Sequence, residues 1–268
     1  MEVKRRLVSS LIFFIAVVAS AVTQAQPLRV PYVSLSPTAG PLWIAIGDGY
    51  VGMNIIPQKL GRQAGLEHFG FEVEDVDEID ARLREKYPAV KLVRRPTNRP
   101  FAGISTHDPE GYVFNLSQKQ MTNRAEVYVE GEWKQPRVVS HLALRALDPE
   151  RLAKFYREIY DLKETEKPNG DPNHYLTDGR VTQVVIPWNI SDYDGAGIEP
   201  RHMDDLGFKV EDLDAFKKDL AVLVRRNPAL SPKAAGAEGE IRLKLLAKCH
   251  GGAFQTADPD GVPIDVAE

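Results

Sequence analysis

The side chains that could carry chemistry in this chain are histidines and carboxylates rather than thiols. There are 6 histidines and 38 aspartates and glutamates, whereas Cys249 is the single cysteine. One cysteine can form neither an intramolecular disulfide nor a thiolate-cluster zinc site, so a bound metal ion would depend on histidine and carboxylate ligands. His250 follows that cysteine and precedes Gly-Gly. It is either a general base, because histidine titrates near neutral pH, or a loop histidine without a catalytic role.

The composition describes a globular chain that can bury a large core. The 268 residues are 43% apolar, and this length suits one large domain or two of about 100–150 residues. The formal charge of −4 comes from 34 basic and 38 acidic residues. Because no basic excess is present to bind a phosphate backbone, we expect no nucleic-acid partner.

The N-terminal residues 1–25 are typical of a targeting segment. A basic start at residues 4–6 precedes an apolar run from Leu11 to Ala19 and then small residues, and cleavage after Ala21 or Ala25 would fit. The run is shorter than the roughly 20 residues of a membrane span, and no later stretch resembles a membrane helix. We expect a signal peptide or an N-terminal anchor, with export to the periplasm or the medium; without it the protein would be cytoplasmic. The alternatives are a buried first strand and a start-codon artefact.

Similar strings recur in the same order in the two halves of the chain. The pairs are 66–77 with 203–214, 46–51 with 176–181, and 108–111 with 258–261, at offsets of 137, 130 and 150 residues. Extra residues in a Pro-, Ala- and Gly-containing loop between Asn227 and Glu240 explain the growing offset. We interpret this pattern as one duplicated module, with an N-terminal copy at 41–120, a linker near 123–137 and a C-terminal copy at 137–268.

Within each half the periodicity alternates between that of strands and that of helices. In the second half we expect strands at 138–145, 175–177, 181–186, 203–210, 241–246, 253–257 and 262–266, and helices at 148–161 and 212–225. Asp148 followed by proline is a helix start, and Asp178-Gly179 is a tight hairpin turn. The pattern is βαβββ, repeated.

This pattern and four strings resemble the vicinal-oxygen-chelate superfamily, which includes glyoxalase I, bleomycin-resistance proteins and extradiol dioxygenases. The strings are His141-Leu-Ala-Leu, Phe155-Tyr156, Gly207-Phe-Lys-Val-Glu-Asp-Leu-Asp214 and Asp258-Pro-Asp-Gly-Val-Pro-Ile-Asp265. The resemblance implies an α+β fold in which tandem βαβββ units form incomplete barrels, and a cupped interior that holds a divalent metal ion such as Fe²⁺, Mn²⁺, Mg²⁺ or Zn²⁺. Fold alone leaves the reaction open.

The resemblance also implies a ligand set in the C-terminal module. Inward-pointing positions on the first and last strands converge on the cavity, and here they hold His141, Asp205 and Asp265. Extradiol dioxygenases have His, His and Glu at these places, so this chain departs at two of the three. His202 lies three residues before Asp205 and is a candidate second histidine. One histidine with two carboxylates suits Mn²⁺ or Mg²⁺ as well as Fe²⁺.

Ring-cleaving relatives usually place a histidine and then a tyrosine before the last ligand. Here His250 is present, but Gln255 stands at the expected tyrosine position and the spacing is short. We therefore hold His250 and Asp205 as the candidate catalytic residues. Each candidate also has a plain structural interpretation: His141 as a core histidine, and Asp205 as a polar residue at the start of a strand.

Counting back through the repeat predicts an incomplete N-terminal module. At an offset of 130 residues, His141 corresponds to Leu11, and the first helix corresponds to residues 18–31, which contain two prolines. We therefore expect the first strand and helix to be missing. His68 matches Asp205 and Asn115 matches Asp265, and because a neutral amide is a poor metal ligand we expect no metal in this module.

The expected function is that of a metal-dependent enzyme acting on a small molecule that chelates the ion through neighbouring oxygens. A glyoxalase-like lyase or isomerase and an extradiol-type dioxygenase are the two enzymatic alternatives. The alternative from another class is a metal-free binding protein of the bleomycin-resistance type. No membrane partner is expected beyond an N-terminal anchor, and a homodimer is compatible with the family.

Overall fold

The computed structural model describes residues 14–19, 44–48, 50–57, 65–94, 103–118, 137–188, 203–233, 239–241, 243–245 and 253–268. The elements of the first half are β1 (Phe14–Ala19), β2 (Ile44–Gly47), β3 (Gly52–Pro57), β4 (Gly70–Val73), α1 (Val76–Lys86), β5 (Val93–Arg94), β6 (Ile104–His107) and β7 (Val113–Gln118). Those of the second half are β8 (Arg137–Ala146), α2 (Pro149–Tyr160), β9 (Lys163–Glu164), β10 (His174–Thr177), β11 (Thr182–Pro187), β12 (Met203–Val210), α4 (Leu213–Arg226), a 3₁₀ turn (Pro228–Leu230), β13 (Phe254–Ala257) and β14 (Pro263–Ala267).

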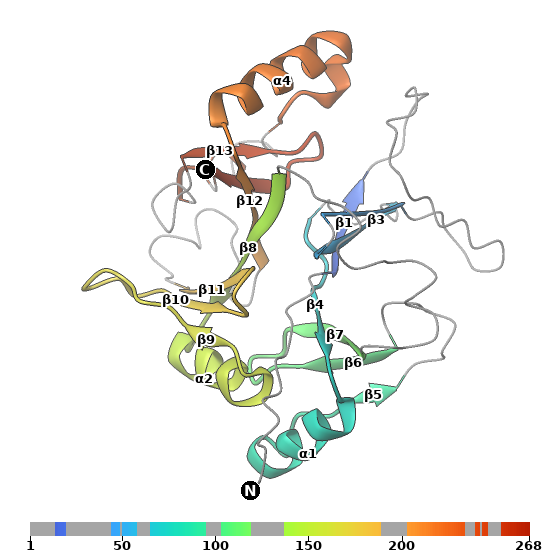
Figure 1. Cartoon of the computed structure of the whole chain (residues 1–268), viewed down its shortest axis with the longest axis vertical. Coiled ribbons are helices and arrows are strands. Elements are labelled where there is room, and N and C mark those ends of the chain that lie inside the picture. The colour runs from blue at the N-terminus through green and yellow to red at the C-terminus, as the bar shows by residue number, and fades with distance from the viewer. Residues whose placement is uncertain are drawn as a thin grey trace, which may run out of the picture.

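The strands form three sheets. A seven-stranded sheet in the order β13-β14-β12-β8-β11-β10-β9 contains the strands of the second half, and it curves along one side of the molecule in Figure 1. The first half forms a three-stranded sheet, β1-β3-β2, and a four-stranded sheet, β4-β7-β6-β5. Mixed sheets with few helices confirm the expected α+β class, without a closed barrel among the described strands.

Strand β8 has two different faces. Leu142, Leu144 and Ala146 on one face are buried in the main core, whereas His141, Ala143 and Arg145 alternate with them. Because successive side chains of a strand point to opposite sides, these three residues share the other face. One face of β8 therefore packs in the main core, and the other carries the polar side chains of His141 and Arg145.

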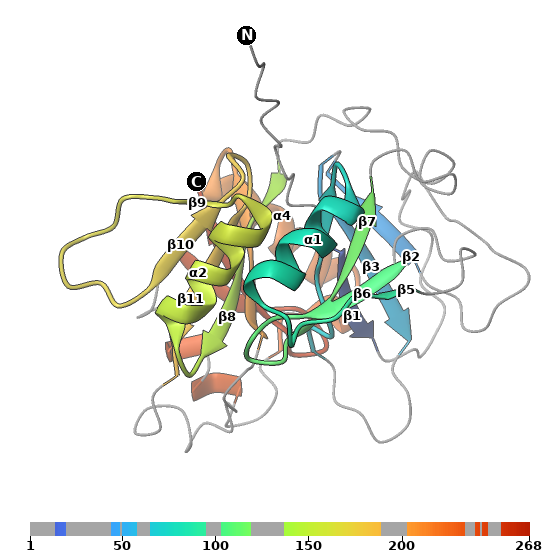
Figure 2. The ribbon, with the colours of Figure 1, turned by 90° about the horizontal axis from the view of Figure 1, so that it is seen from below.

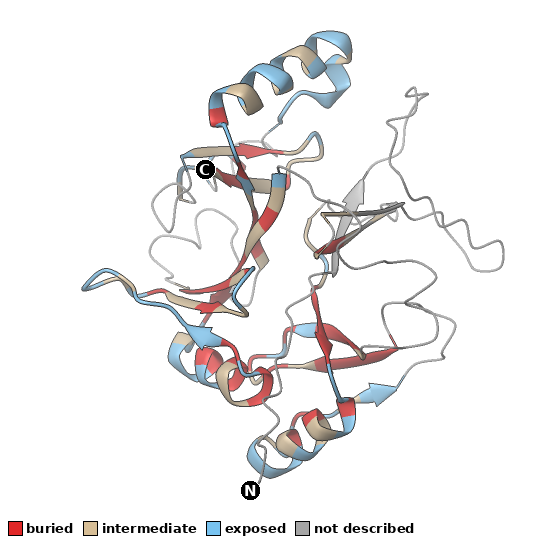
Figure 3. Cartoon of the chain, viewed as in Figure 1, coloured by how far each residue is buried: buried red, intermediate tan, exposed pale blue. Residues whose placement is uncertain are grey.

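The main core is shared by the two halves. Helix α2 presents Tyr156 and Tyr160 to the four-stranded sheet, where the rings of Tyr160 and Phe71 stack at 4.5 Å and those of Phe69 and Phe114 stack at 5.1 Å. Figure 2 shows α1 and α2 side by side, with α1 in front of β6 and β7 and α2 in front of β8, β10 and β11, and Figure 3 shows buried residues on both sides of this contact. Aromatic contacts of this kind bury large areas and fix ring geometry, so the halves pack as one body.

Polar contacts also join the halves, at the turn between β6 and β7. Asp108 accepts a hydrogen bond from the Tyr156 hydroxyl at 2.7 Å, and the Tyr112 hydroxyl donates to the carbonyl of Arg145. The two carboxylate oxygens of Glu110 accept hydrogen bonds from the backbone N–H groups of residues 147 and 148 at 2.9 and 2.7 Å. The turn therefore fixes the backbone between β8 and α2.

Most elements expected in the second half are confirmed. Asp148 caps α2 by accepting from the N–H of Arg151, and Asp212 caps α4 in the same way from Ala215. The strand expected at 241–246 is wrong, because residues 239–241 and 243–245 are helical. That stretch is rich in leucine, lysine and arginine, which favour helix over strand when no sheet partner selects the extended form.

A strand at the N-terminus corrects a second expectation. Strand β1 pairs in parallel with β3, with Phe14 beside Gly52, just as β8 pairs with β11 and places His141 beside Thr182. The prediction that the first strand is missing is therefore wrong, and Phe14 rather than Leu11 occupies the position of His141. The expected helix position after β1 lies outside the described residues.

No helix in the described part of the chain is long and apolar enough to cross a bilayer.

Candidate metal centre

Three neighbouring strands bring His141, Asp205 and Asp265 together. In the pairing of β8 with β12, Gly207 lies opposite His141, and in the pairing of β12 with β14, Gly207 lies beside Asp265. Asp205 lies two residues before Gly207 on the middle strand. The three predicted ligands thus share one face of the sheet around a single glycine.

The side chains of these residues meet directly. His141 Nε2 lies 3.2 Å from Asp205 Oδ1 and 3.6 Å from Asp265 Oδ2. Both aspartates are 0% exposed. The Ser140 hydroxyl lies 3.0 Å from His141 Nδ1, so when that nitrogen carries a proton it donates to Ser140 and Nε2 keeps its lone pair toward the carboxylates.

Gly207 makes room for the histidine. A Cβ atom built on Gly207 would lie 1.9 Å from Cε1 and 2.0 Å from Nδ1 of His141. Any other residue would collide with the ring, so the imidazole can cross the middle strand only because position 207 has no side chain. The Gly207-Phe string indicated the fold and gave the glycine no role in the site; the signal that could have found it is a glycine inside a strand pattern, which marks a close approach.

A second polar pair supports Asp265 from the neighbouring strand. Gln255 lies opposite Asp265 in the β13–β14 pairing, and its Nε2 donates to Asp265 Oδ1 at 2.8 Å. Arg145 and Asp204 form a buried ion pair at 2.7 Å. Because this pair balances its own charge, Asp205 and Asp265 are the carboxylates left to face His141.

The donor set fits a divalent ion. Two ligands held at about 2.1 Å from a metal and at right angles to each other lie about 3.0 Å apart, close to the 3.2 and 3.6 Å separations observed from Nε2. Within the described residues, no three His, Cys, Asp or Glu side chains form a ready-made metal cluster. Two carboxylates also match the charge of one dication, and coordination of a metal is one of the ways in which proteins compensate buried charges.

Burial and charge act in opposite directions on His141. Burial alone would lower the pKa of the imidazole, but the hydrogen bond and charge of Asp205, together with the charge of Asp265, more than offset it and raise that pKa. The same carboxylates that attract a proton would attract a cation.

The corresponding positions of the N-terminal half carry different residues. Asn115 lies beside Gly70 in the pairing of β4 with β7, as Asp265 lies beside Gly207. Ser105 donates to the side-chain oxygen of Asn115 at 2.8 Å. His68, the match of Asp205, lies 3.9 Å from Glu67. With Phe14 at the position of His141, this half has no comparable donor set among its described residues.

Two candidates from the sequence, His250 and His202, lie outside the described residues. Asp258, which we interpreted as a turn residue, accepts backbone hydrogen bonds from residues 260 and 262 at 2.9 Å. Its role in the turn between β13 and β14 is therefore structural.

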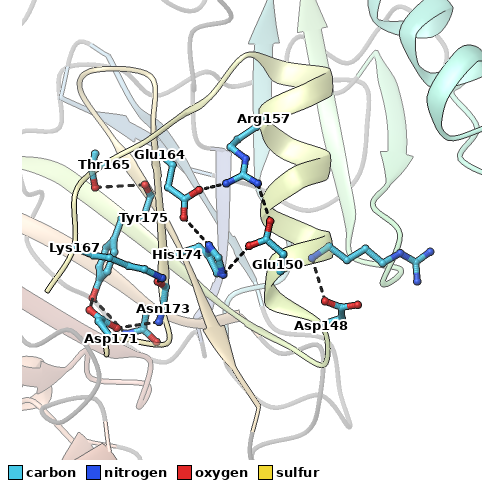
Figure 4. Close-up of polar contacts among 11 residues, drawn as sticks. Asp148, Glu150, Arg157, Glu164, Thr165, Lys167, Asp171, Asn173, His174 and Tyr175 are labelled. Carbon is cyan, nitrogen blue, oxygen red and sulfur yellow. Dashed lines mark hydrogen bonds and ion pairs between the residues drawn. The ribbon is translucent and has the colours of Figure 1, made fainter. Parts of the chain in front are cut away.

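A second cluster of ionisable groups lies between α2 and the β9–β10 strands (Figure 4). His174 lies 2.6 Å from Glu164 and 3.6 Å from Glu150, and Arg157 pairs with both of these glutamates. Burial, followed by the charge of Lys167, lowers the pKa of His174. Arg157 balances one of the two glutamate charges and contacts both carboxylates, so this cluster ties the strands to the helix.

Comparison with solved structures gives matches over nearly the whole chain. The Mn(II)-bound glyoxalase from Novosphingobium aromaticivorans matches with a TM-score of 0.61 at 11% identity, covering 97% of this chain and 82% of that one. The 2,3-dioxygenase LapB from Pseudomonas sp. KL28 matches with 0.58 at 14% identity, covering 97% and 92%. A catechol 2,3-dioxygenase matches with 0.57 at 13% identity, covering 96% and 87%. No family model and no curated protein matches the sequence.

These matches agree on the architecture. At such low identity they establish the fold alone, and the fold is that of the vicinal-oxygen-chelate superfamily, as the sequence strings indicated.

Proposed function

We propose that this chain, which has the vicinal-oxygen-chelate fold, is a divalent-metal-dependent enzyme acting on a small molecule with two neighbouring oxygens. The observation that carries the proposal is the convergence of His141 with two fully buried carboxylates, Asp205 and Asp265. Buried charges in proteins are normally paired or coordinate metals. The solved Mn(II)-bound glyoxalase of the same fold supports a divalent metal ion as the ligand of these residues.

The residues would divide the work as follows. His141 Nε2 and one oxygen each of Asp205 and Asp265 would hold the ion, which when bound supplies Lewis-acid polarisation of the substrate oxygens. Ser140 orients the ring of His141 through Nδ1. The face of the sheet beyond the carboxylates carries a small apolar cluster of Ala143, Val184 and Ile186, which would exclude water from the bound substrate.

Proton transfer requires a base from this chain. Of the two candidates from the sequence, Asp205 lies in the described site with both its oxygens buried, and His250 follows from the sequence alone. Asp205→Asn and His250→Gln separate them only when the metal content of each variant is measured beside turnover. The base is the residue whose replacement abolishes turnover while the protein keeps its metal and still binds the substrate.

An activity screen chooses between the two enzymatic alternatives. Protein is loaded in turn with Mn²⁺, Mg²⁺, Zn²⁺ and, under anaerobic conditions, Fe²⁺. Each sample is then offered a 2-oxoaldehyde with thiol, or a catechol together with dioxygen. We expect metal-dependent turnover of one of them that is lost in His141→Ala. Ligand-induced thermal stabilisation without metal and without product would contradict the proposal and favour a binding protein of the bleomycin-resistance type.

A further inference from the structure

The two oxygens of the Asp265 carboxylate have different neighbours. Oδ1 accepts the 2.8 Å hydrogen bond from the side-chain amide of Gln255, whereas Oδ2 is the oxygen that faces His141 at 3.6 Å. Gln255 and Asp265 are direct partners across the β13–β14 pair. The sheet therefore imposes this contact, independently of any bound ion.

A hydrogen bond from a side-chain amide to one oxygen restricts the rotation of the Asp265 carboxylate. A buried carboxylate is free to rotate about its last torsion unless a neighbour holds it. With Oδ1 held by an N–H donor on the adjacent strand, Asp265 presents Oδ2 to the centre, and a rotation that turned both oxygens toward an ion would weaken that hydrogen bond. Ligation through one oxygen suits compact six-coordinate ions, whereas Ca²⁺ prefers more oxygens and often a bidentate carboxylate.

We propose that Gln255 is a positioning residue that holds Asp265 as a one-oxygen ligand and thereby favours a small six-coordinate ion such as Mn²⁺ over Ca²⁺. This inference rests on the proposed function. A matched pair in the other half of the chain provides the comparison: Ser105 lies opposite Asn115 on β6 and β7 and donates to its side-chain oxygen at the same 2.8 Å. There the acceptor is neutral.

The test measures ion affinity rather than turnover. Full-length Gln255→Met keeps the length of the side chain and removes the donor; Gln255→Asn keeps the amide but is one methylene shorter. Mn²⁺ and Ca²⁺ are titrated separately by calorimetry, with free Mn²⁺ also followed by electron paramagnetic resonance. We expect the Mn²⁺ Kd to rise about tenfold or more in both variants, while the Ca²⁺ Kd changes less than about threefold. Ser105→Ala should leave both constants unchanged.

The outcomes separate this inference from the proposed function. The role of Gln255 alone is overturned by one combination of results. The wild type binds Mn²⁺ through His141, and the Gln255 variants show the same preference for Mn²⁺ over Ca²⁺ as the wild type. A lower unfolding temperature without a change in that preference does the same, since it indicates a structural role. Wild-type protein that takes up no Mn²⁺, or takes it up equally after His141→Ala, overturns the proposed function and this inference together. If Gln255→Met does not fold, Gln255→Asn decides.

Discussion

Substitution of Gly207 by alanine tests the geometry of the site with a single methyl group. The new Cβ would lie 1.9 Å from Cε1 and 2.0 Å from Nδ1 of His141. Ordinary contact begins at 3.4 Å, so the imidazole must retreat by about 1.5 Å. Overpacking of this kind costs about 1–3 kcal/mol, and a displaced ligand of that size lowers metal affinity by about tenfold to a hundredfold.

Gly70→Ala is the matched control, because Gly70 lies beside Asn115 as Gly207 lies beside Asp265. Its Cβ would meet the Asn115 carbonyl oxygen at 2.9 Å, so it crowds the backbone of the other half without touching the site. Urea unfolding reports stability, and Mn²⁺ titration reports affinity. Gly207→Ala should lose both, and Gly70→Ala only stability. Wild-type Mn²⁺ affinity in Gly207→Ala would refute the claim that His141 reaches the ion across position 207.

Three further changes probe the surroundings of the site. Burial raises the pKa of Asp108 to about 6 from 3.8, so the folded state holds the proton to higher pH than the unfolded chain, and the free energy of unfolding falls as pH rises from about 4 to 6. The total fall is roughly 3 kcal/mol. Asp108→Asn should remove this pH dependence, as measured by urea unfolding at pH 4, 5 and 7. A parallel pH dependence in both proteins would contradict this. Glu110→Ala removes two hydrogen bonds to the backbone before α2. It should lower the free energy of unfolding by about 2–4 kcal/mol, with metal affinity retained under conditions where the variant is folded. A decrease below roughly 0.5 kcal/mol, the lower limit for one hydrogen bond, would contradict the role of this turn in holding the two halves together. Arg145→Met leaves Asp204 buried without its ion-pair partner and should cost about 3–5 kcal/mol, whereas the double change with Asp204→Leu should recover most of it; an unrecovered double variant would refute the pairing as the cause.

Local signals in the sequence were enough to predict the second half closely. Asp148 followed by proline, together with an apolar stripe, placed α2 within one residue of its observed ends. Such signals act over a few residues and do not depend on distant partners. The 241–246 segment had no comparable signal, because its apolar residues fit a strand and a helix equally well.

Register between strands was the part that periodicity could not supply. A constant repeat offset made Leu11 the equivalent of His141, but the parallel pairing of β1 with β3 makes Phe14 the equivalent residue. The hairpins of both halves keep one offset, whereas the connection between the first strand and the hairpin differs in length. The contact of Gly207 with His141 is likewise a property of pairing between β8 and β12, which no single strand reveals.

The ligand trio itself came from the resemblance to the superfamily. The structure brings Asp205 and Asp265 within 3.2 and 3.6 Å of His141 Nε2. Their role as metal ligands remains our proposal, and the roles of Gln255 and Gly207 follow from the sheet.

Metal content is the measurement that tests the central claim most directly. Full-length protein is incubated with Mn²⁺, freed of excess ion and analysed by elemental mass spectrometry beside His141→Ala and Asp265→Asn, with Ser105→Ala as a folded control. We predict one Mn²⁺ per chain in the wild type and in Ser105→Ala, and a loss of at least about ninety per cent in the two site variants. A wild type without stoichiometric metal, or site variants that retain it, would contradict the account.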